Sequence, residues 1–322
     1  MRFIFRFVQI GLLLCAILSA RGDVLDSVRA DLDSGRADQG LETLSQVIAQ
    51  QPQNAEAFNL QCRIYLQKEL WDNAIDACKA AVKLAPGNSN YHLWLARALG
   101  EKADRVSFIT AFKLAKQIRQ EFETAAKLDP QNADALSDLG EFYVDAPSMV
   151  GGGIDKAERV AQQLEAIAPD RAHYARARIA EKQKDYARAE QEYKASIVGT
   201  KDPADAWMEL ASFYRRRERW DDMIQAVKTG ASLDTKHGVA LADGASVLVR
   251  AGRELPLARQ LMEQYLASPN KSEDAPAFHV HVEMSKVLSK LGDNQGAQEH
   301  LAAAQELARN YQPAVKATNS GR

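Results

Sequence analysis

The residues best suited to chemistry in this sequence do not form a recognisable nucleotide-binding pattern. The run Gly151–Lys156 (GGGIDK) has the glycines of a phosphate-binding loop, but it lacks the GxxxxGK[ST] spacing and no predicted strand precedes it. Asp155 is better explained as the cap of the helix that follows. We therefore expect no nucleotide site here.

The histidines and acidic residues also show no catalytic or metal-ligand spacing. The six histidines are His92, His173, His237, His279, His281 and His300. No HExxH motif occurs among them, and His279 and His281 are two residues apart, so they face different sides of a helix. No GxSxG motif is present, and the pair Asp221 and Asp222 suits the start of a helix, where carboxylates complement the dipole. The sequence predicts no catalytic residue, no metal site and no cofactor, and thus a protein that is not an enzyme.

The composition is that of a foldable, mildly acidic protein. The chain has 322 residues, of which 46% are hydrophobic and 26% charged, which is enough to build a packed core and a polar surface. Its formal net charge is −2, whereas binding to nucleic acid would favour a clearly basic domain. We expect no nucleic-acid partner.

The N-terminus has the layout of a secretory signal peptide. Arg2 and Arg6 precede an apolar run of eleven residues, and the small residues Ser19 and Ala20 end it. The run is shorter than the roughly 18 to 20 residues that span a bilayer as a helix. We predict that residues 1–22 are removed and that the mature protein is periplasmic or secreted.

Two details of this leader stay open. Cleavage after Ala20 or after Gly22 fits the sequence, and the alternative is an uncleaved anchor, the one route by which we expect the chain to reach a membrane. Cys15 lies inside the apolar run and lacks a small residue before it, so we interpret it as part of the run rather than as a lipidation site.

The clearest pattern in the chain is a unit of 34 residues over 55–88, AEAFNLQCRIYLQKELWDNAIDACKAAVKLAPGN. Its large and small residues stand at fixed positions of that unit. They are Phe58, Tyr65, Trp71, Ala74, Ala81 and Pro86, at positions 4, 11, 17, 20, 27 and 32. This unit resembles the tetratricopeptide repeat (TPR) almost position by position.

The resemblance extends over eight tandem units and implies an all-α, right-handed α-solenoid of helical hairpins, each with helices A and B. Within a TPR array over 23–310, the approximate repeats are 21–54, 55–88, 89–132, 133–169, 170–203, 204–237, 238–273 and 277–310. The first repeat is a weak match, as expected of a terminal repeat with one face in water. Polar residues over 268–276 indicate a linker, and we expect 311–322 to be a flexible tail.

In TPR proteins the A helices line a concave face that binds partners, and the resemblance carries this role to residues at the matching positions. They are Asn59, Arg63, Trp94, Arg97, Asp138, Glu141, Tyr174, Arg178, Met208 and Arg215. The recurring arginines predict a groove for carboxylates of a protein or extended peptide. The alternative is a merely solvated charged face. The residues do not match the pattern of TPR clamps that bind chaperone tails.

Repeats three and four carry insertions of about ten and five residues, both between helix A and helix B. Since all such turns lie along one edge of a solenoid, we expect 100–108 and 145–155 to be neighbours. This insertion edge would expose Phe108, Pro147, Met149 and Val150 as a second binding site. The alternative is a pair of tolerated loops, which cost little stability.

Two cysteines remain in the mature chain, Cys62 and Cys78. The resemblance places them on facing helices of the second hairpin. An oxidising compartment would permit a disulfide between them. The alternative is two small buried thiols.

Together these patterns predict a non-catalytic TPR scaffold of the cell envelope that binds a protein or extended peptide in its concave groove, with a second contact along the insertion edge. The alternative is an accessory or substrate-capturing subunit of an envelope enzyme or of an export or assembly machine. The identity of the partner is not written in the sequence, because residues of the groove vary with the ligand.

Overall fold

A computed structural model describes residues 24–236 and 238–320, so the predicted leader and His237 lie outside the described residues. Helices form most of this part, and it contains no strand, which confirms the all-α solenoid. After a helical segment over 24–34, the A helices are α3 (Ala55–Gln67), α5 (Ser89–Ala103), α7 (Ala133–Asp145), α9 (Pro169–Lys182), α11 (Pro203–Arg216), α13 (Val239–Ala251) and α15 (Ala277–Lys290). The B helices are α2 (Ala37–Gln50), α4 (Trp71–Leu84), α6 (Phe108–Leu128), α8 (Ile154–Glu165), α10 (Tyr186–Gly199), α12 (Trp220–Leu233), α14 (Leu255–Ala267) and α16 (Asn294–Leu307).

The connection between helix A and helix B is short in six hairpins and longer in two. Six hairpins have a residue with positive φ at this turn, and each reverses the chain within a few residues. They are Gly35, Glu69, Lys184, Glu218, Gly252 and Gly292. The two hairpins without such a short turn are those with insertions, where the chain first runs through 104–107 or through the 3-10 helix η1 (Ser148–Val150).

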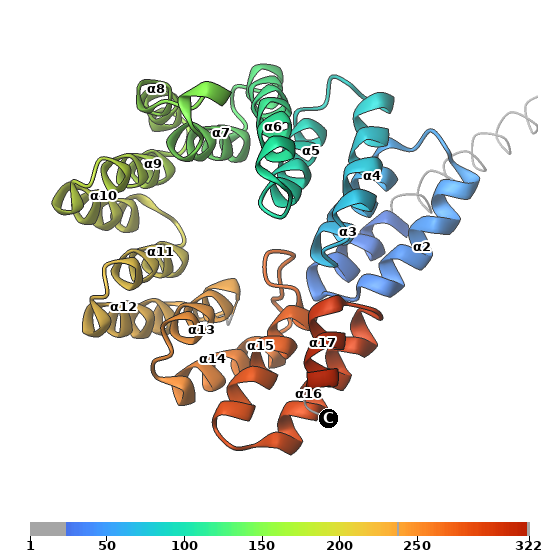
Figure 1. The fold of residues 1–322 in the computed structure, drawn as a ribbon, viewed down its shortest axis with the longest axis vertical. Coiled ribbons are helices and arrows are strands. Elements are labelled where there is room, and N and C mark those ends of the chain that lie inside the picture. The colour runs from blue at the N-terminus through green and yellow to red at the C-terminus, as the bar shows by residue number, and fades with distance from the viewer. Residues whose placement is uncertain (1–23, 237, 321–322) are drawn as a thin grey trace, which may run out of the picture.

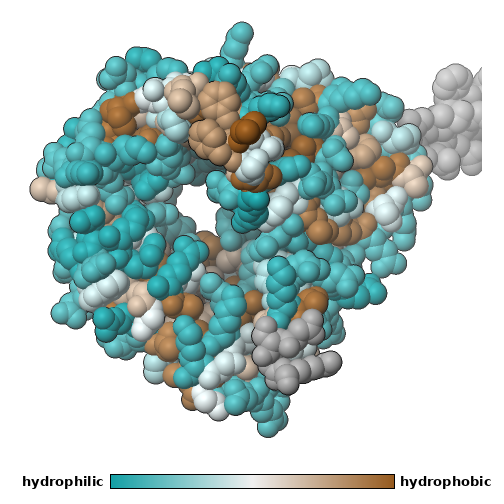
Figure 2. Space-filling model, viewed as in Figure 1, coloured by the Kyte–Doolittle hydropathy of each residue, from teal (hydrophilic) through white to brown (hydrophobic). Residues whose placement is uncertain are grey.

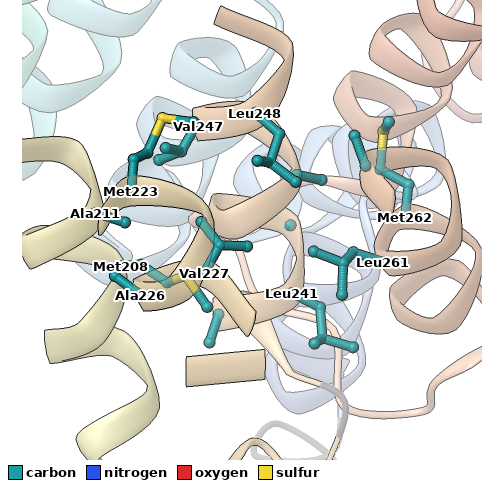
Figure 3. Packing of buried hydrophobic residues seen from close by; sticks show 14 of the residues in the cluster. Met208, Ala211, Met223, Ala226, Val227, Leu241, Val247, Leu248, Leu261 and Met262 are labelled. Atoms are coloured by element: carbon teal, nitrogen blue, oxygen red, sulfur yellow. The ribbon is translucent and has the colours of Figure 1, made fainter. Parts of the chain in front are cut away.

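Small residues set the distances between helices, both within a hairpin and between consecutive hairpins. A Cβ atom added to Gly230 in α12 would lie 2.7 Å from Cε of Met208, and one added to Gly244 in α13 would lie 3.0 Å from its Sδ. The two glycines thus make the space that the Met208 side chain fills, and Figure 3 shows this methionine among Ala226, Val227 and their neighbours. Such close packing of small and large side chains is what lets helix axes approach.

The array does not end in water but closes into a ring (Figure 1). The first repeat shares one apolar core with the last, in which Leu25, Val28 and Leu44 pack with Phe278 and Leu301. At the turn, Gly35 approaches α15 so closely that a Cβ atom there would lie 2.6 Å from the Ala277 backbone nitrogen. The expectation that the first repeat departs from the consensus because one face meets water is therefore wrong.

Polar contacts complete this closing seam, the interface between the first two repeats and residues 268–320. Arg63 of α3 donates from both Nε, at 2.9 Å, and Nη2 to the Glu273 carboxylate. Gln67, one turn further along α3, donates to the Glu273 carbonyl oxygen over 3.1 Å. Its own carbonyl oxygen lies 2.6 Å from Nε2 of His279. The segment 268–276, predicted as a linker, is therefore a structural part of the ring, and Figure 1 shows it projecting toward α3.

The C-terminal residues also belong to the ring. Instead of a flexible tail over 311–322, the chain forms helix α17 (Gln312–Ser320), in which Ala314 is fully buried in the shared core. Tyr311 precedes it, stacks on the His279 ring at 4.9 Å and donates from its hydroxyl to Glu69 over 3.0 Å. The tail is ordered because it has an apolar side to bury and a partner surface that ring closure supplies.

Candidate binding surface on the inside of the ring

The inside of the ring is a concave surface formed mainly by A helices. In Figure 1, α7, α9, α11 and α13 lie nearer the centre than α8, α10, α12 and α14. Figure 2 shows an opening through the middle of the ring, rimmed mostly by hydrophilic residues. The groove expected from the repeats is thus the wall of a lumen.

Four of the predicted groove residues come together near the closing seam. The Trp94 ring lies between two guanidinium groups, with Cζ of Arg63 at 4.9 Å and Cζ of Arg97 at 4.6 Å from its centroid. Nε of Arg97 donates to Asp138 over 2.6 Å, and this pairing raises the pKa of Arg97 although burial opposes it. Arg63, Trp94 and Arg97 line, together with Glu273, a hollow of about 660 Å³.

Three further predicted residues lie together on the next repeats. The Tyr174 hydroxyl donates to Glu141 over 2.7 Å. Burial and the charges of Glu209 and Glu141 raise the pKa of Tyr174 well above its usual value, so this hydroxyl keeps its proton. Arg178 pairs with Asp145 at 3.0 Å. These contacts join α7 to α9.

Two predicted groove residues do not face the lumen. Met208 is only 3% exposed, because Gly230 and Gly244 leave room for it between the hairpins. Asn59 is 5% exposed and lies in α3 one turn before Arg63. Neither is available to a partner in the closed ring.

The arginines of the lumen are mostly engaged with acidic residues of the protein itself. Their ion pairs are Arg63 with Glu273, Arg97 with Asp138, and Arg178 with Asp145. Of the predicted groove arginines only Arg215 forms no ion pair in the described part of the chain. Burial and the like charges of Arg250 and Arg216 lower its pKa. A groove built to hold a partner's carboxylates therefore has few free cations to do so.

The lumen also contains unpaired carboxylates that the sequence-based prediction missed. Asp205, Glu209 and Asp243 lie on α11 and α13 with exposed side chains, and within the described residues none has a hydrogen-bonding or ion-pair partner. Burial and repulsion by neighbouring carboxylates raise the pKa of Asp205 to about 6 and that of Asp243 to about 7, and they also raise the pKa of Glu209. Asp205 stands at position two of its repeat, and Glu209 and Asp243 stand at position six of theirs. The predicted groove uses the sixth position only for Trp94 and Asp138, so extending it to later repeats would have found two of them.

Some of these carboxylates line a second hollow of about 460 Å³ between α7, α9 and α11. Its wall includes Glu141, Asp170, Asp202, Asp205 and Glu209. The basic residue in this wall is Arg171, which pairs with Asp134 outside it. The hollow is thus polar and negatively charged, with Tyr174 as its aromatic side chain.

The four residues of the predicted insertion edge differ in exposure. Phe108 is 77% and Met149 65% exposed, and Pro147 is exposed as well. Val150 is only 3% exposed, because η1 folds back against the middle of α6, where Arg119 lies over Gly151. The loop 145–155 thus packs on α6 itself, and Val150 is not part of an exposed ridge.

The two cysteines form a disulfide that joins α3 to α4, with their Cα atoms 5.2 Å apart. The described residues contain no group of three or more His, Cys, Asp or Glu side chains placed to hold a metal ion. Among the same residues, no helix combines the length and the apolar character needed to cross a membrane.

Comparisons with known proteins agree with this architecture. Residues 149–205 match a tetratricopeptide repeat model, and residues 37–149 match the model of regulator of microtubule dynamics proteins 1-3. Each match covers less than half of the chain. Among curated proteins the comparison finds no match.

Solved structures with this fold include yeast Tom70, with a TM-score of 0.55 and 14% identity over 88% of this chain. The chain spans 58% of the length of that Tom70 chain. Another is a thermophilic TPR protein of Thermus thermophilus, with a TM-score of 0.47 and 20% identity over 64% of this chain and 97% of that one. The repeat match over 149–205 and the helical architecture together show a TPR-type helical scaffold, an architecture consistent with protein–protein interaction.

Proposed function

We propose that this TPR protein is a non-catalytic scaffold that binds an extended, positively charged segment of a partner protein on the inside of its ring. The observation that carries the proposal is the unequal pairing of charges in the lumen. Arg63, Arg97 and Arg178 are engaged with acidic residues of the ring. Asp205, Glu209 and Asp243 have no such partner within residues 24–236 and 238–320.

Electrostatics makes a lysine- or arginine-bearing segment the best ligand for this surface. A guanidinium or ammonium group placed among the three carboxylates would relieve their mutual repulsion and form charge-assisted hydrogen bonds. The concave wall would also focus the negative field and speed the encounter with a basic partner. The sequence predicted a groove that binds carboxylates of a partner, whereas the groove proposed here binds cationic side chains of a partner.

The proposed compartment is the cell envelope or the exterior. The Cys62–Cys78 disulfide supports it, since such bonds persist in oxidising environments and are rare in the cytosol. The N-terminal pattern of residues 1–22 supports it independently.

The test is crosslinking in cells followed by mass spectrometry, together with binding of a fluorescent lysine- and arginine-rich peptide in vitro. The test variant carries Asp205→Asn, Glu209→Gln and Asp243→Asn. The control variant carries Glu42→Gln, Asp76→Asn and Asp221→Asn, which neutralise three exposed carboxylates on the B helices α2, α4 and α12. We expect the test variant to lose its partners and to bind the peptide about tenfold or more weakly, while the control binds as the wild type does.

The pH dependence of peptide binding gives a second measure of the same site. Below pH 6 both Asp205 and Asp243 take up protons and lose their charge, so affinity for the basic peptide should fall as pH decreases from 8 to 5. The proposal would be contradicted if the test and control variants crosslinked to the same partners, or if the wild-type protein bound an acidic peptide more tightly than the basic one. Recovery of an enzyme or export machine as the crosslinked partner would favour the role of accessory subunit.

A further inference from the structure

Helix α6 is longer than the other B helices and projects from the ring. It has 21 residues, whereas α4, α10 and α12 have 14 each. Both α4 and α6 end two residues before the proline of their repeat, so the additional seven residues, 108–114, lie at the N-terminal end of α6. Two extra helical turns correspond to about 10 Å.

The tip of this projection, residues 106–116, exposes large apolar side chains. Phe108 is 77% and Ile109 72% exposed, and Phe112, one turn further on, is half-buried. Most other exposed large hydrophobic residues of the described chain stand singly, and several are only 40–45% exposed. Figure 2 shows hydrophobic residues gathered over α6 on this side of the ring. Isolated apolar residues need no explanation, but adjacent, almost fully exposed ones on a projecting helix mark a contact surface.

The charges within this tip are all positive. The sequence has no aspartate or glutamate between Arg105 and Gln120. Lys113 and Lys116 form no ion pair within the described residues, and Nζ of Lys116 lies 4.7 Å from the Phe112 ring centroid. The remaining cations of this stretch, Arg105 and Arg119, pair with acidic residues at its two ends. The tip therefore combines an apolar end with two ammonium groups behind it.

We propose that this tip docks the ring onto an anionic lipid surface. Phe108 and Ile109 would enter the boundary between headgroups and acyl chains, and Lys113 and Lys116 would meet the lipid phosphates one to two turns higher. A convex tip with flexible lysines suits the soft surface of a membrane, whereas a protein partner would meet a groove or a polar hydrogen-bonding rim. The proposal is independent of that for the ring interior, because it uses other residues on another side of the fold.

The test is cosedimentation of residues 23–322, which include the whole closed ring of residues 24–320, with vesicles of phosphatidylcholine alone or with phosphatidylglycerol. The test variants are Phe108→Ser with Ile109→Ser, and Lys113→Glu with Lys116→Glu. Matched controls are Val198→Ser with Leu233→Ser, which remove exposed apolar residues elsewhere, and Lys79→Glu with Lys228→Glu, which reverse exposed lysines on α4 and α12.

We expect binding to phosphatidylglycerol vesicles that is at least about tenfold stronger than to neutral ones. Each test variant should lose about tenfold or more, while both controls bind as the wild type does. Unchanged circular dichroism of the variants would show that the losses are not due to unfolding. Absence of vesicle binding, equal loss in the controls, or capture of a soluble protein through Phe108 without any binding to vesicles would overturn the proposal.

Discussion

The ring has two kinds of seam, and they are built differently. The seams between consecutive repeats are largely apolar and join residues close in sequence, such as Met208 of α11 with Gly244 of α13. The closing seam joins residues more than 200 positions apart and adds to its apolar core a set of polar contacts around Arg63, Gln67 and Glu273. A short connection aligns consecutive hairpins, but nothing covalent aligns the first with the eighth, so directional hydrogen bonds must specify their register.

The largest difference between the seams should follow removal of a buried aromatic ring from each. Phe278 is fully buried in the closing core, and Phe213 lies 5.3 Å from the Tyr193 ring between repeats five and six. Each change to alanine should cost about 3–5 kcal/mol in the free energy of unfolding. Only Phe278→Ala should also open the ring, seen as a larger radius of gyration in X-ray scattering. If the ring of the Phe278→Ala variant stayed closed, the polar contacts of the closing seam would be sufficient to hold the first and last repeats together.

The disulfide should stabilise the protein without deciding whether the ring is closed. It joins α3 to α4 within one hairpin, so it does not cross the closing seam. Replacing Cys62 and Cys78 by alanine should lower the free energy of unfolding by about 3 kcal/mol and leave the radius of gyration unchanged. Mass spectrometry with and without reductant checks the bond, and two free thiols in protein isolated from its native compartment would contradict it.

The charged contact of the closing seam should have a smaller effect. Arg63 and Glu273 are each about 20% exposed and joined by two hydrogen bonds. We expect a coupling of about 1–2 kcal/mol in a double-mutant cycle of Arg63→Met and Glu273→Gln. The matched pair Arg171 and Asp134, about half exposed between repeats four and five, should give less than about 0.5 kcal/mol. Equal couplings would show that the closing seam is not specially dependent on charge.

The smallest expected effect is a weakening of the closing seam at low pH. Burial lowers the pKa of His279 although its hydrogen bond to the Gln67 carbonyl opposes this shift. The folded ring thus binds fewer protons than the unfolded chain as pH falls below the ordinary histidine value of about 6.5, and stability decreases there. Unfolding monitored from pH 8 to pH 5 should show this slope, and His279→Gln should reduce it. A slope that is the same in the variant would assign it to other groups.

The sequence predicted the local order of the fold well, since spacing of large and small residues fixes each hairpin. It did not predict ring closure, because contacts such as Arg63–Glu273 leave no periodic trace in one sequence. It also placed Met208 in the groove, since the repeat rule ignores the space that Gly230 opens. The lumen acids on α11 and α13 were missed because the position that two of them occupy is not part of the usual groove rule. Whether an arginine is free or paired depends on neighbouring repeats, so the sign of the free charge emerges only in three dimensions.

Ring closure also changes how such an array should come apart. The stability of a linear repeat protein approximates a sum over repeats and their shared faces, so its outermost units fray first. A closed ring has no outermost unit, and releasing any one hairpin breaks two faces at once. Unfolding of this protein should therefore begin with a single costly rupture at one interface, after which the array loses repeats from two newly made ends.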